Sequence, residues 1–204
     1  AAETVIKVEE AVNVPVIVYG TEDLEKDAEL AKVIATRAEG KNLILGPAKE
    51  ENFKKVGAPA IGYKQTVVGM TPIDVNLAKQ LNILLTNLGM NADNLVIDPT
   101  TGALGYGLEY TYSVMERLKI AALNQDDSMT QMPMLANIGY QSWKTKEAKS
   151  SEDEYPEWGD PEKRGITWET ITAISLLLSG ADILVLRHPE SIRMTKQLIA
   201  DLSG

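Results

Sequence analysis

One short loop gathers most of the residues that suit ligand binding. Residues 98–107 read DPTTGALGYG and come directly after an apolar run. Three glycines within six residues let backbone N–H groups approach a ligand closely, and two threonine hydroxyls add further hydrogen bonds. The members that could contact phosphate, carboxylate or amide oxygens are Asp98, Thr100, Thr101, Gly102, Gly105, Tyr106 and Gly107. A second interpretation stays open, in which Asp98 caps a turn and the glycines relieve steric crowding.

A second candidate follows the last apolar run, where Arg187 and His188 precede Pro189. A single histidine at the end of a strand suits acid–base chemistry or metal binding. It equally suits a structural hydrogen bond, and the sequence alone favours that role.

The segment from Gly139 to Gly165 follows the fifth apolar run and is too long for an ordinary strand-to-helix loop, which has about 2–6 residues. Its aromatic residues Trp143, Tyr155 and Trp158 suggest that it binds a ligand or covers a neighbour. The charges around Lys144, Lys146 and Glu147 are most simply a solvated face. Asn137 and Tyr140 lie where this segment leaves the strand.

Composition excludes several classes of site. The 204 residues include 20 Lys and Arg against 29 Asp and Glu, which gives a net charge of −9 and argues against a nucleic-acid-binding face. With no cysteine and one histidine, the chain offers no thiolate or multi-histidine metal site and no cysteine-held iron–sulfur cluster. No apolar run approaches the ~18 residues of a membrane helix, and no apolar leader is visible. We expect a soluble, cytoplasmic protein without a membrane partner.

Six short apolar runs must position these residues. They are nearly continuous rather than alternating, as in strands covered on both faces of a parallel sheet. We predict strands near residues 14–18, 42–46, 66–70, 94–98, 133–138 and 182–187.

Segments of helical period lie between the predicted strands. A helix precedes the first strand at residues 4–12, and others are predicted at 107–123, 165–180 and 191–202. Thr21 is predicted to cap a helix that ends at Gly40, and Thr71 to cap a helix that ends at Gly89. Between these two, a short helix at residues 50–56 is predicted to be disturbed by Gly57 and Pro59.

Alternating strands and helices indicate a parallel α/β fold, either doubly wound or a (β/α)₈ TIM barrel. Neither a glycine-rich dinucleotide fingerprint nor a Walker A motif is present. Six units favour a barrel that lacks about its first two βα units, forming a single domain over residues 1–204. In such a barrel, ligands bind at the C-terminal ends of the strands, where the candidate residues lie.

Eight longer motifs closely resemble the small (delta) subunit of the corrinoid iron–sulfur protein, which belongs to the carbon monoxide dehydrogenase/acetyl-CoA synthase system. The motifs are PIDVNLAKQLN (72–82), DPTTGALGYGLEY (98–110), YSVMER (112–117), MPM (132–134), WKTKEA (143–148), PEWG (156–159), RGITWE (164–169) and RHPE (187–190). The resemblance covers almost the whole chain. It departs at the start, since members of this family have further N-terminal residues that include the first two strands.

The resemblance implies a TIM barrel related to pterin-binding methyltransferases. It implies a corrinoid (cobamide) shared with a large subunit, which alone carries the iron–sulfur cluster. The other implied partners are a methyltetrahydrofolate methyltransferase and acetyl-CoA synthase, between which the cobalt carries a methyl group. The chemistry would reside on the corrinoid, so the chain is expected to supply enclosure and no catalytic residue.

From their position at strand ends, the expected corrinoid-binding residues are Asp98, Thr100, Thr101, Gly102, Gly105, Tyr106, Gly107, Asn137, Tyr140, Arg187 and His188. His188 is a poor candidate for a cobalt ligand, because the corrinoid-ligating pattern Asp-x-His-x-x-Gly is absent. Two alternatives stay open: a stand-alone pterin-binding methyltransferase, in which Asp98 and Asn137 read the pterin edge, and a non-catalytic docking scaffold.

Overall fold

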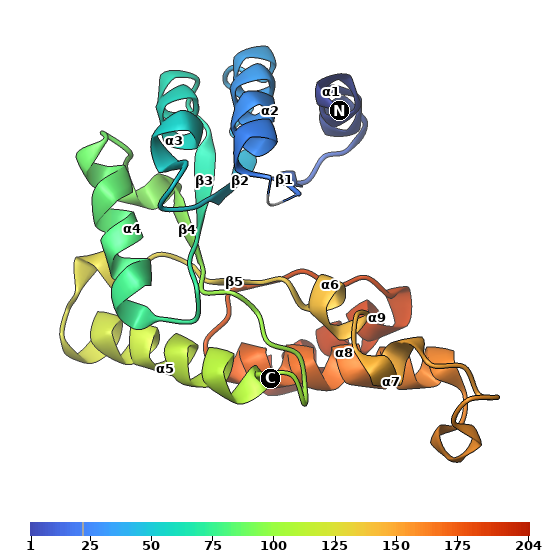
Figure 1. Ribbon diagram of the computed structural model, residues 1–204. Coiled ribbons are helices and arrows are strands. Elements are labelled where there is room, and N and C mark those ends of the chain that lie inside the picture. Colours follow the sequence, from blue (N-terminus) through green and yellow to red (C-terminus); the bar gives the residue numbers. More distant parts are fainter. Residues whose placement is uncertain (22) are drawn as a thin grey trace. The chain divides into compact units, whose positions relative to one another are not determined.

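The computed structural model describes residues 1–21 and 23–204 (Figure 1). In chain order the elements are α1 (Ala2–Ala11), β1 (Ile17–Tyr19), α2 (Leu24–Arg37), β2 (Ile44–Ala48), α3 (Phe53–Gly62), β3 (Thr66–Met70), α4 (Val75–Asn87), η1 (Ala92–Asn94), β4 (Leu95–Asp98), α5 (Leu108–Asn124), η2 (Ser128–Thr130), β5 (Leu135–Ala136), α6 (Ile138–Ser142), α7 (Lys146–Lys149), η3 (Pro156–Trp158), α8 (Pro161–Leu178), β6 (Ile183–Leu184) and α9 (Pro189–Ser203). They form two compact units, Ala1–Asp98 with Ala121–Pro133, and Pro99–Ile120 with Met134–Gly204.

The first unit is built on a parallel sheet in the order β1-β2-β3-β4. The strands β3 and β4 are buried along nearly their whole length, with Val67 and Ile97 in the core, as continuous apolar runs require. The strand β1 pairs only with β2 in this sheet and is half-buried. The helices α2, α3 and α4 follow their strands and pack in sequence (Figure 1).

The second unit contains the parallel pair β5 and β6, in which Leu135 faces Ile183. Its core includes Met115 and Leu118 of α5, Ile138 of α6 and Leu176 of α8, all fully buried. The six predicted strands are therefore present in the described chain, and every pairing between them is parallel.

One feature of the sheet differs from the prediction of a single six-stranded arc. The strands form a four-stranded and a two-stranded sheet, because the ladder is not continued after β4. The Ile97 N–H donates to the Pro133 carbonyl at 2.9 Å, but this single bond is not followed by a ladder between β4 and β5. The strand β5 begins two residues later, at Leu135.

Two predicted helix caps are wrong by a few residues. The α2 helix is capped by Asp23, whose carboxylate accepts from the Lys26 N–H, and not by Thr21. The α4 helix is capped by Asp74, which accepts from two N–H groups, and not by Thr71. Thr71 instead donates its N–H to the Asp98 carbonyl and so extends β3. In each case a carboxylate with favourable cap geometry lies closer to the first helical turn.

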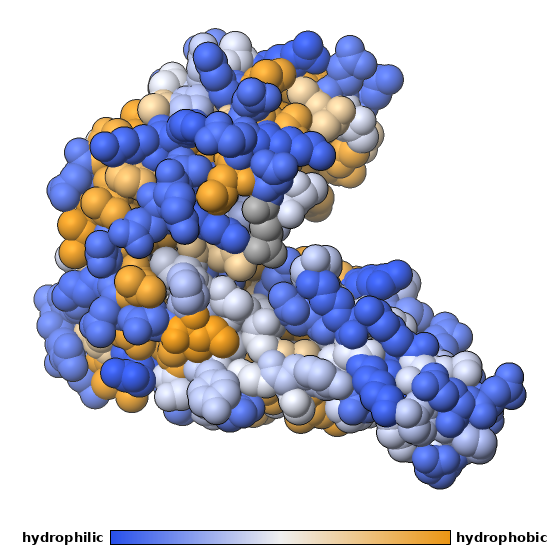
Figure 2. Space-filling view, in the orientation of Figure 1, coloured by the Kyte–Doolittle hydropathy of each residue, from blue (hydrophilic) through white to orange (hydrophobic). Residues whose placement is uncertain are grey.

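Two further predictions need correction. The α3 helix runs through Gly57 and Pro59 and is not ended by them. Gly57 lets α3 approach α4, because a Cβ there would lie 3.1 Å from the Leu85 side chain. The segment from Gly139 to Gly165 is not one long loop, because it contains most of α6, then α7 and η3. Hydrophilic residues cover the region around α7 and η3 (Figure 2), as its charges predicted.

Candidate functional site

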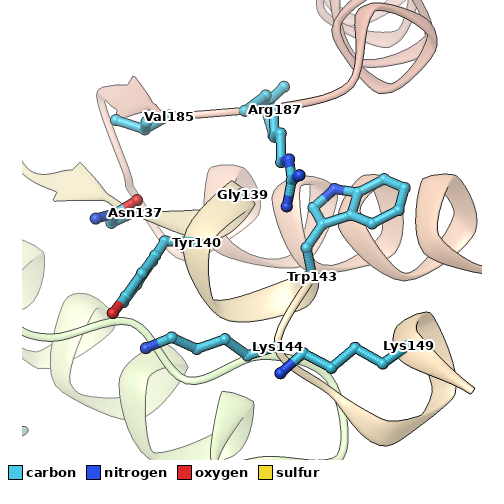
Figure 3. Close-up of a pocket in the computed structure, with 9 residues that line it drawn as sticks. Asn137, Gly139, Tyr140, Trp143, Lys144, Lys149, Val185 and Arg187 are labelled. Carbon is cyan, nitrogen blue, oxygen red and sulfur yellow. The ribbon is translucent and has the colours of Figure 1, made fainter.

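A pocket of about 560 Å³ lies in the second unit, just past the carboxyl ends of β5 and β6 (Figure 3). Two chain segments form its wall, one running through α6 into α7 and the other leaving β6. The lining residues are Asn137, Gly139, Tyr140, Trp143, Lys144, Lys149, Val185, Leu186 and Arg187. Its volume falls in the range of small-molecule sites, about 300–1,000 Å³.

Gly139 lets the two walls meet. Its N–H donates to the Val185 carbonyl at 2.8 Å, which extends the β5–β6 pairing by one bond. A Cβ at Gly139 would lie 2.8 Å from the backbone nitrogen of Arg187 and 3.0 Å from a Glu169 carboxylate oxygen. Only a residue without a side chain allows this approach.

Glu169, on α8, fixes the turn between β6 and α9 and was not predicted from the sequence. The residue is fully buried, and its two carboxylate oxygens accept the backbone N–H groups of Arg187 and His188. A buried carboxylate with both oxygens hydrogen-bonded in this way holds the backbone from which the Arg187 side chain departs. The available signal was a glutamate in the middle of α8, on the face that also buries Ala173 and Leu176.

His188 has the structural role that the sequence favoured. It is the N-cap of α9, where its Nδ1 accepts the Glu190 N–H at 3.1 Å. Its Nε2 lies 3.3 Å from a Glu162 carboxylate oxygen, and its ring stacks on Trp143 with 5.9 Å between the centroids. Both ring nitrogens therefore have partners within the protein.

Cations and aromatic rings dominate the pocket wall. The Lys144 Nζ lies 3.3 Å from the centroid of the Tyr140 ring, and the Arg187 guanidinium lies 5.4 Å from the Trp143 ring. Figure 3 shows the Arg187 side chain extending toward the Trp143 indole. The Trp143 Nε1 is buried and has no hydrogen-bond partner among the described residues. The sequence-based interpretation of Lys144 as part of a solvated face is therefore incomplete.

The predicted glycine-rich loop is partly closed upon itself. In the second unit, the N–H groups of Gly102 and Leu104 donate to the hydroxyls of Thr111 and Thr172 at 2.8 and 3.2 Å. The Thr101 hydroxyl is buried and accepts the Asn137 N–H at 2.8 Å. These groups hold the loop in place instead of pointing to a ligand.

The exposed end of this loop is better suited to an interaction. Gly105 and Gly107 have φ of +73° and +93°, and Thr100 also has a positive φ of +63°. The half-exposed Tyr106 donates its hydroxyl to a Glu147 carboxylate oxygen at 3.1 Å. A depression of about 90 Å³ beside it includes Lys144, which also lines the larger pocket, so the two adjoin.

Asp98 belongs to the first unit, whereas the rest of the predicted loop belongs to the second. It is buried at the end of β4, and its Oδ2 accepts a short hydrogen bond from the Tyr19 hydroxyl at the end of β1. Tyr19 was not predicted as its partner. This pairing could not be predicted from the sequence, because it depends on the parallel order of four strands.

The structure thus gathers part of the predicted set in one pocket. Asn137, Tyr140 and Arg187 line it, Thr101 supports it through Asn137, and His188 contacts Trp143. Sequence reasoning missed the roles of Lys144, Lys149, Val185 and Leu186, and noted Trp143 only as an aromatic residue of a long segment. Within residues 1–21 and 23–204, no helix is long and apolar enough to cross a bilayer, and no cluster of His, Asp and Glu suits a metal ion.

Comparison with solved structures supports the predicted barrel. The chain superimposes on a dihydropteroate synthase from Yersinia pestis, determined with a pterine-sulfa conjugate, with a TM-score of 0.62 and 13% identity, covering 100% of this chain and 75% of the other. A second Yersinia pestis dihydropteroate synthase structure, with a sulfonamide drug complex, gives a TM-score of 0.51 and 12% identity over 98% and 85% of the two chains. At this identity the likeness establishes the fold alone. Together with the parallel strands, it confirms an α/β fold of the (β/α)₈ type.

Sequence comparison is more specific. The acetyl-CoA decarbonylase/synthase complex subunit delta of Methanosarcina mazei is 36% identical over 209 residues, covering 100% of this chain and 48% of the relative. The subunit of the same name from Methanopyrus kandleri is 39% identical over 97% of this chain and 48% of its own length. The chain therefore spans about half the length of these relatives. A family model described as "CO dehydrogenase/acetyl-CoA synthase delta subunit" matches residues 1–199. The chain belongs to the CO dehydrogenase/acetyl-CoA synthase delta-subunit family.

Proposed function

We propose that this chain is the barrel of a delta subunit that helps to hold and cap a corrinoid carrying a methyl group to acetyl-CoA synthase. The methyl group would come from methyltetrahydrofolate through a separate methyltransferase. The observation that carries the proposal is the family match over residues 1–199, with relatives named as subunits of an acetyl-CoA decarbonylase/synthase complex. The chain has no cysteine, so we assign the iron–sulfur cluster to a large partner subunit. We place this assembly in the cytoplasm.

The residues of the second unit suit such a ligand. A corrin ring has an apolar face and a rim of amide groups. The Tyr140 and Trp143 rings offer apolar surface, Asn137 offers an amide on the same wall, and the Arg187 guanidinium can donate to amide oxygens. The backbone at Gly105 and Gly107 is free of side chains and adds a close approach.

The role of the chain is enclosure and orientation. When bound, the corrinoid supplies the cobalt that carries the methyl group. The aromatic wall would exclude water and oxidants from one side of the ligand, and the polar groups would fix its orientation. Asp98 is not part of this assignment, since its carboxylate is buried against Tyr19.

The test is cobalt occupancy in the complex with the large subunit. We expect the co-purified complex to show a corrinoid visible spectrum, and Gly105→Val to lower the cobalt content per heterodimer. A β-branched residue at a φ of +73° is strained by about 1–2 kcal/mol and adds bulk in open space. Gly40→Val is the matched control: Gly40 has a φ of +76°, also faces open space, and belongs to the first unit, so its cobalt content should not change.

Other outcomes would replace the proposal. Full cobalt occupancy and unchanged methyl transfer in Gly105→Val would remove the loop from the site. Tight binding of methyltetrahydrofolate by the chain alone would support a pterin-binding methyltransferase. Complex formation that neither needs nor retains a corrinoid would support a docking scaffold.

A further inference from the structure

We propose that the pocket beyond β5 and β6 binds an oxyanion of the phosphate class, held by Arg187, Lys144, Lys149 and the indole N–H of Trp143. The natural ligand would be a small phosphate ester, whose apolar part packs on the aromatic wall. This inference does not rest on the corrinoid proposal, since it concerns a charged group and is tested with a simple anion.

The first argument for an anion is the charge of the pocket wall. Three of the nine lining residues are Lys or Arg and none is Asp or Glu, in a chain whose net charge is −9. Across residues 1–21 and 23–204, no carboxylate oxygen lies within 4.0 Å of the charged nitrogens of Lys144, Lys149 or Arg187. Unneutralised cations around one concavity raise the local concentration of anions.

Three carboxylates of α7 and α8 have partners other than the basic groups of the pocket. Both oxygens of Glu169 accept backbone N–H groups, and one oxygen of Glu147 accepts the Tyr106 hydroxyl. Glu162 lies against the His188 ring. The pocket therefore has basic groups in excess and lacks an internal counter-ion among the described residues.

The second argument is an unsatisfied hydrogen-bond donor, the indole N–H of Trp143. The Trp143 Nε1 is buried without a partner in the described part of the chain, and an unpaired buried donor is unfavourable until it finds an acceptor. The group beside it is the Arg187 guanidinium, which is also only a donor, so the two cannot bond to each other. An oxyanion between them would accept from both, and the planar guanidinium suits two parallel bonds to phosphate.

Location and size fit this ligand. Phosphate groups in (β/α)₈ barrels frequently bind in loops at the C-terminal ends of two neighbouring strands, as here. A volume of about 560 Å³ is larger than a single phosphate needs, which leaves room for an organic group against Tyr140 and Trp143. Glu169 is a positioning residue for this site, because it holds the backbone of Arg187.

The test is a titration of the whole chain with inorganic phosphate at constant ionic strength, followed by isothermal calorimetry and by tryptophan fluorescence. We expect saturable binding that Arg187→Gln weakens by at least about tenfold, the usual value of a charged hydrogen bond. Trp143→Phe keeps an aromatic ring at this place and removes the indole N–H, so it should weaken binding, followed by calorimetry, by about threefold or more. The matched control is Arg193→Gln on α9, whose guanidinium already pairs with Glu190 outside the pocket, and it should leave binding unchanged.

The outcomes are separable. Binding that does not saturate, or that Arg193→Gln weakens as much as Arg187→Gln does, would overturn the site in favour of general surface charge. If Arg187→Gln loses its native circular dichroism, Lys144→Gln replaces it, with the same weakening expected and an unchanged affinity counting against the site. The phosphate titration contains no corrinoid, so its result is independent of the cobalt measurement. Phosphate binding by the chain together with no cobalt in the co-purified complex would keep this inference and reject only the corrinoid proposal.

Discussion

Gly102 allows the loop at residues 99–107 to close upon itself. A Cβ at this residue would lie 2.4 Å from the carbonyl carbon of Gly107, a backbone atom that cannot turn aside. We expect Gly102→Ala to lower the free energy of unfolding by about 1–3 kcal/mol, the usual cost of overpacking. Urea denaturation measures this. Gly62→Ala is the control: a Cβ there meets nothing within 4 Å at the end of α3, so a comparable loss in both variants would refute the steric explanation.

A second effect at the residue scale depends on pH. The hydrogen bond from Lys79 lowers the pKa of the Asp127 carboxyl below its ordinary 3.8. The folded protein therefore binds this proton more weakly than the unfolded chain does. The resulting stability is complete well above pH 3.8 and is lost as the pH falls through the lower, folded-state pKa.

We expect Lys79→Met to cost about 1 kcal/mol or less at pH 7, since the lysine is partly exposed. The difference in unfolding free energy between this variant and the unchanged protein should shrink below about pH 4, where Asp127 takes up its proton first in the unfolded chain and then in the folded protein. Urea denaturation at several pH values measures this difference. A constant difference from pH 7 to pH 3 would show that the lost lysine acts through packing instead.

At the scale of elements, Arg164 ties the short α7 helix to α8. Its two terminal nitrogens donate to the carbonyl oxygens of Glu147 and Ser150, at the end of α7. A helix of four residues has little stability of its own, so its place depends on such tertiary bonds. We expect Arg164→Gln to release residues 146–160 and to speed their cleavage by trypsin several-fold, with a small change in Tm.

The neighbouring Lys163 provides the control for this experiment. Its side chain is exposed, and no tertiary hydrogen bond of its Nζ is present in the described structure. Like Arg164→Gln, Lys163→Gln removes one trypsin site and one charge, but it breaks no hydrogen bond to α7. Trypsin should therefore cleave this variant between residues 146 and 160 no faster than the unchanged protein. Equal cleavage in the two variants would mean that Arg164 does not hold the segment.

At the scale of the whole molecule, the single domain predicted over residues 1–204 stays a prediction. The structure has two compact units, and the chain passes between them after Asp98, Ile120 and Pro133. The α5 helix contributes residues to both units, so one unit cannot lose it without affecting the other. We therefore expect one cooperative unfolding transition, with the calorimetric enthalpy equal to the van't Hoff value. Two separate transitions in differential scanning calorimetry would show two domains.

Much of the architecture could be predicted from the sequence for a physical reason. Runs such as 66–70 and 94–98 are apolar on both faces, and this pattern specifies buried parallel strands whatever the partners are. The periodic segments likewise specified helices such as α5 and α9, within about three residues. Helix starts were less certain, since Asp23 and Thr21 are both acceptable caps and only the geometry of the preceding turn selects one.

The site was decided largely by the tertiary structure. The sequence placed Arg187 and Asn137 at strand ends, which is enough to predict that they face the same side of a barrel. It did not show that Trp143 and Lys144 join them, because that depends on α6 folding directly after β5 and on Gly139 admitting the Arg187 backbone. Nor did it show that Thr101 and Asp98 turn to internal partners, Asn137 and Tyr19. Residue type and local order set the elements, whereas contacts between distant segments set which polar groups remain available to a ligand.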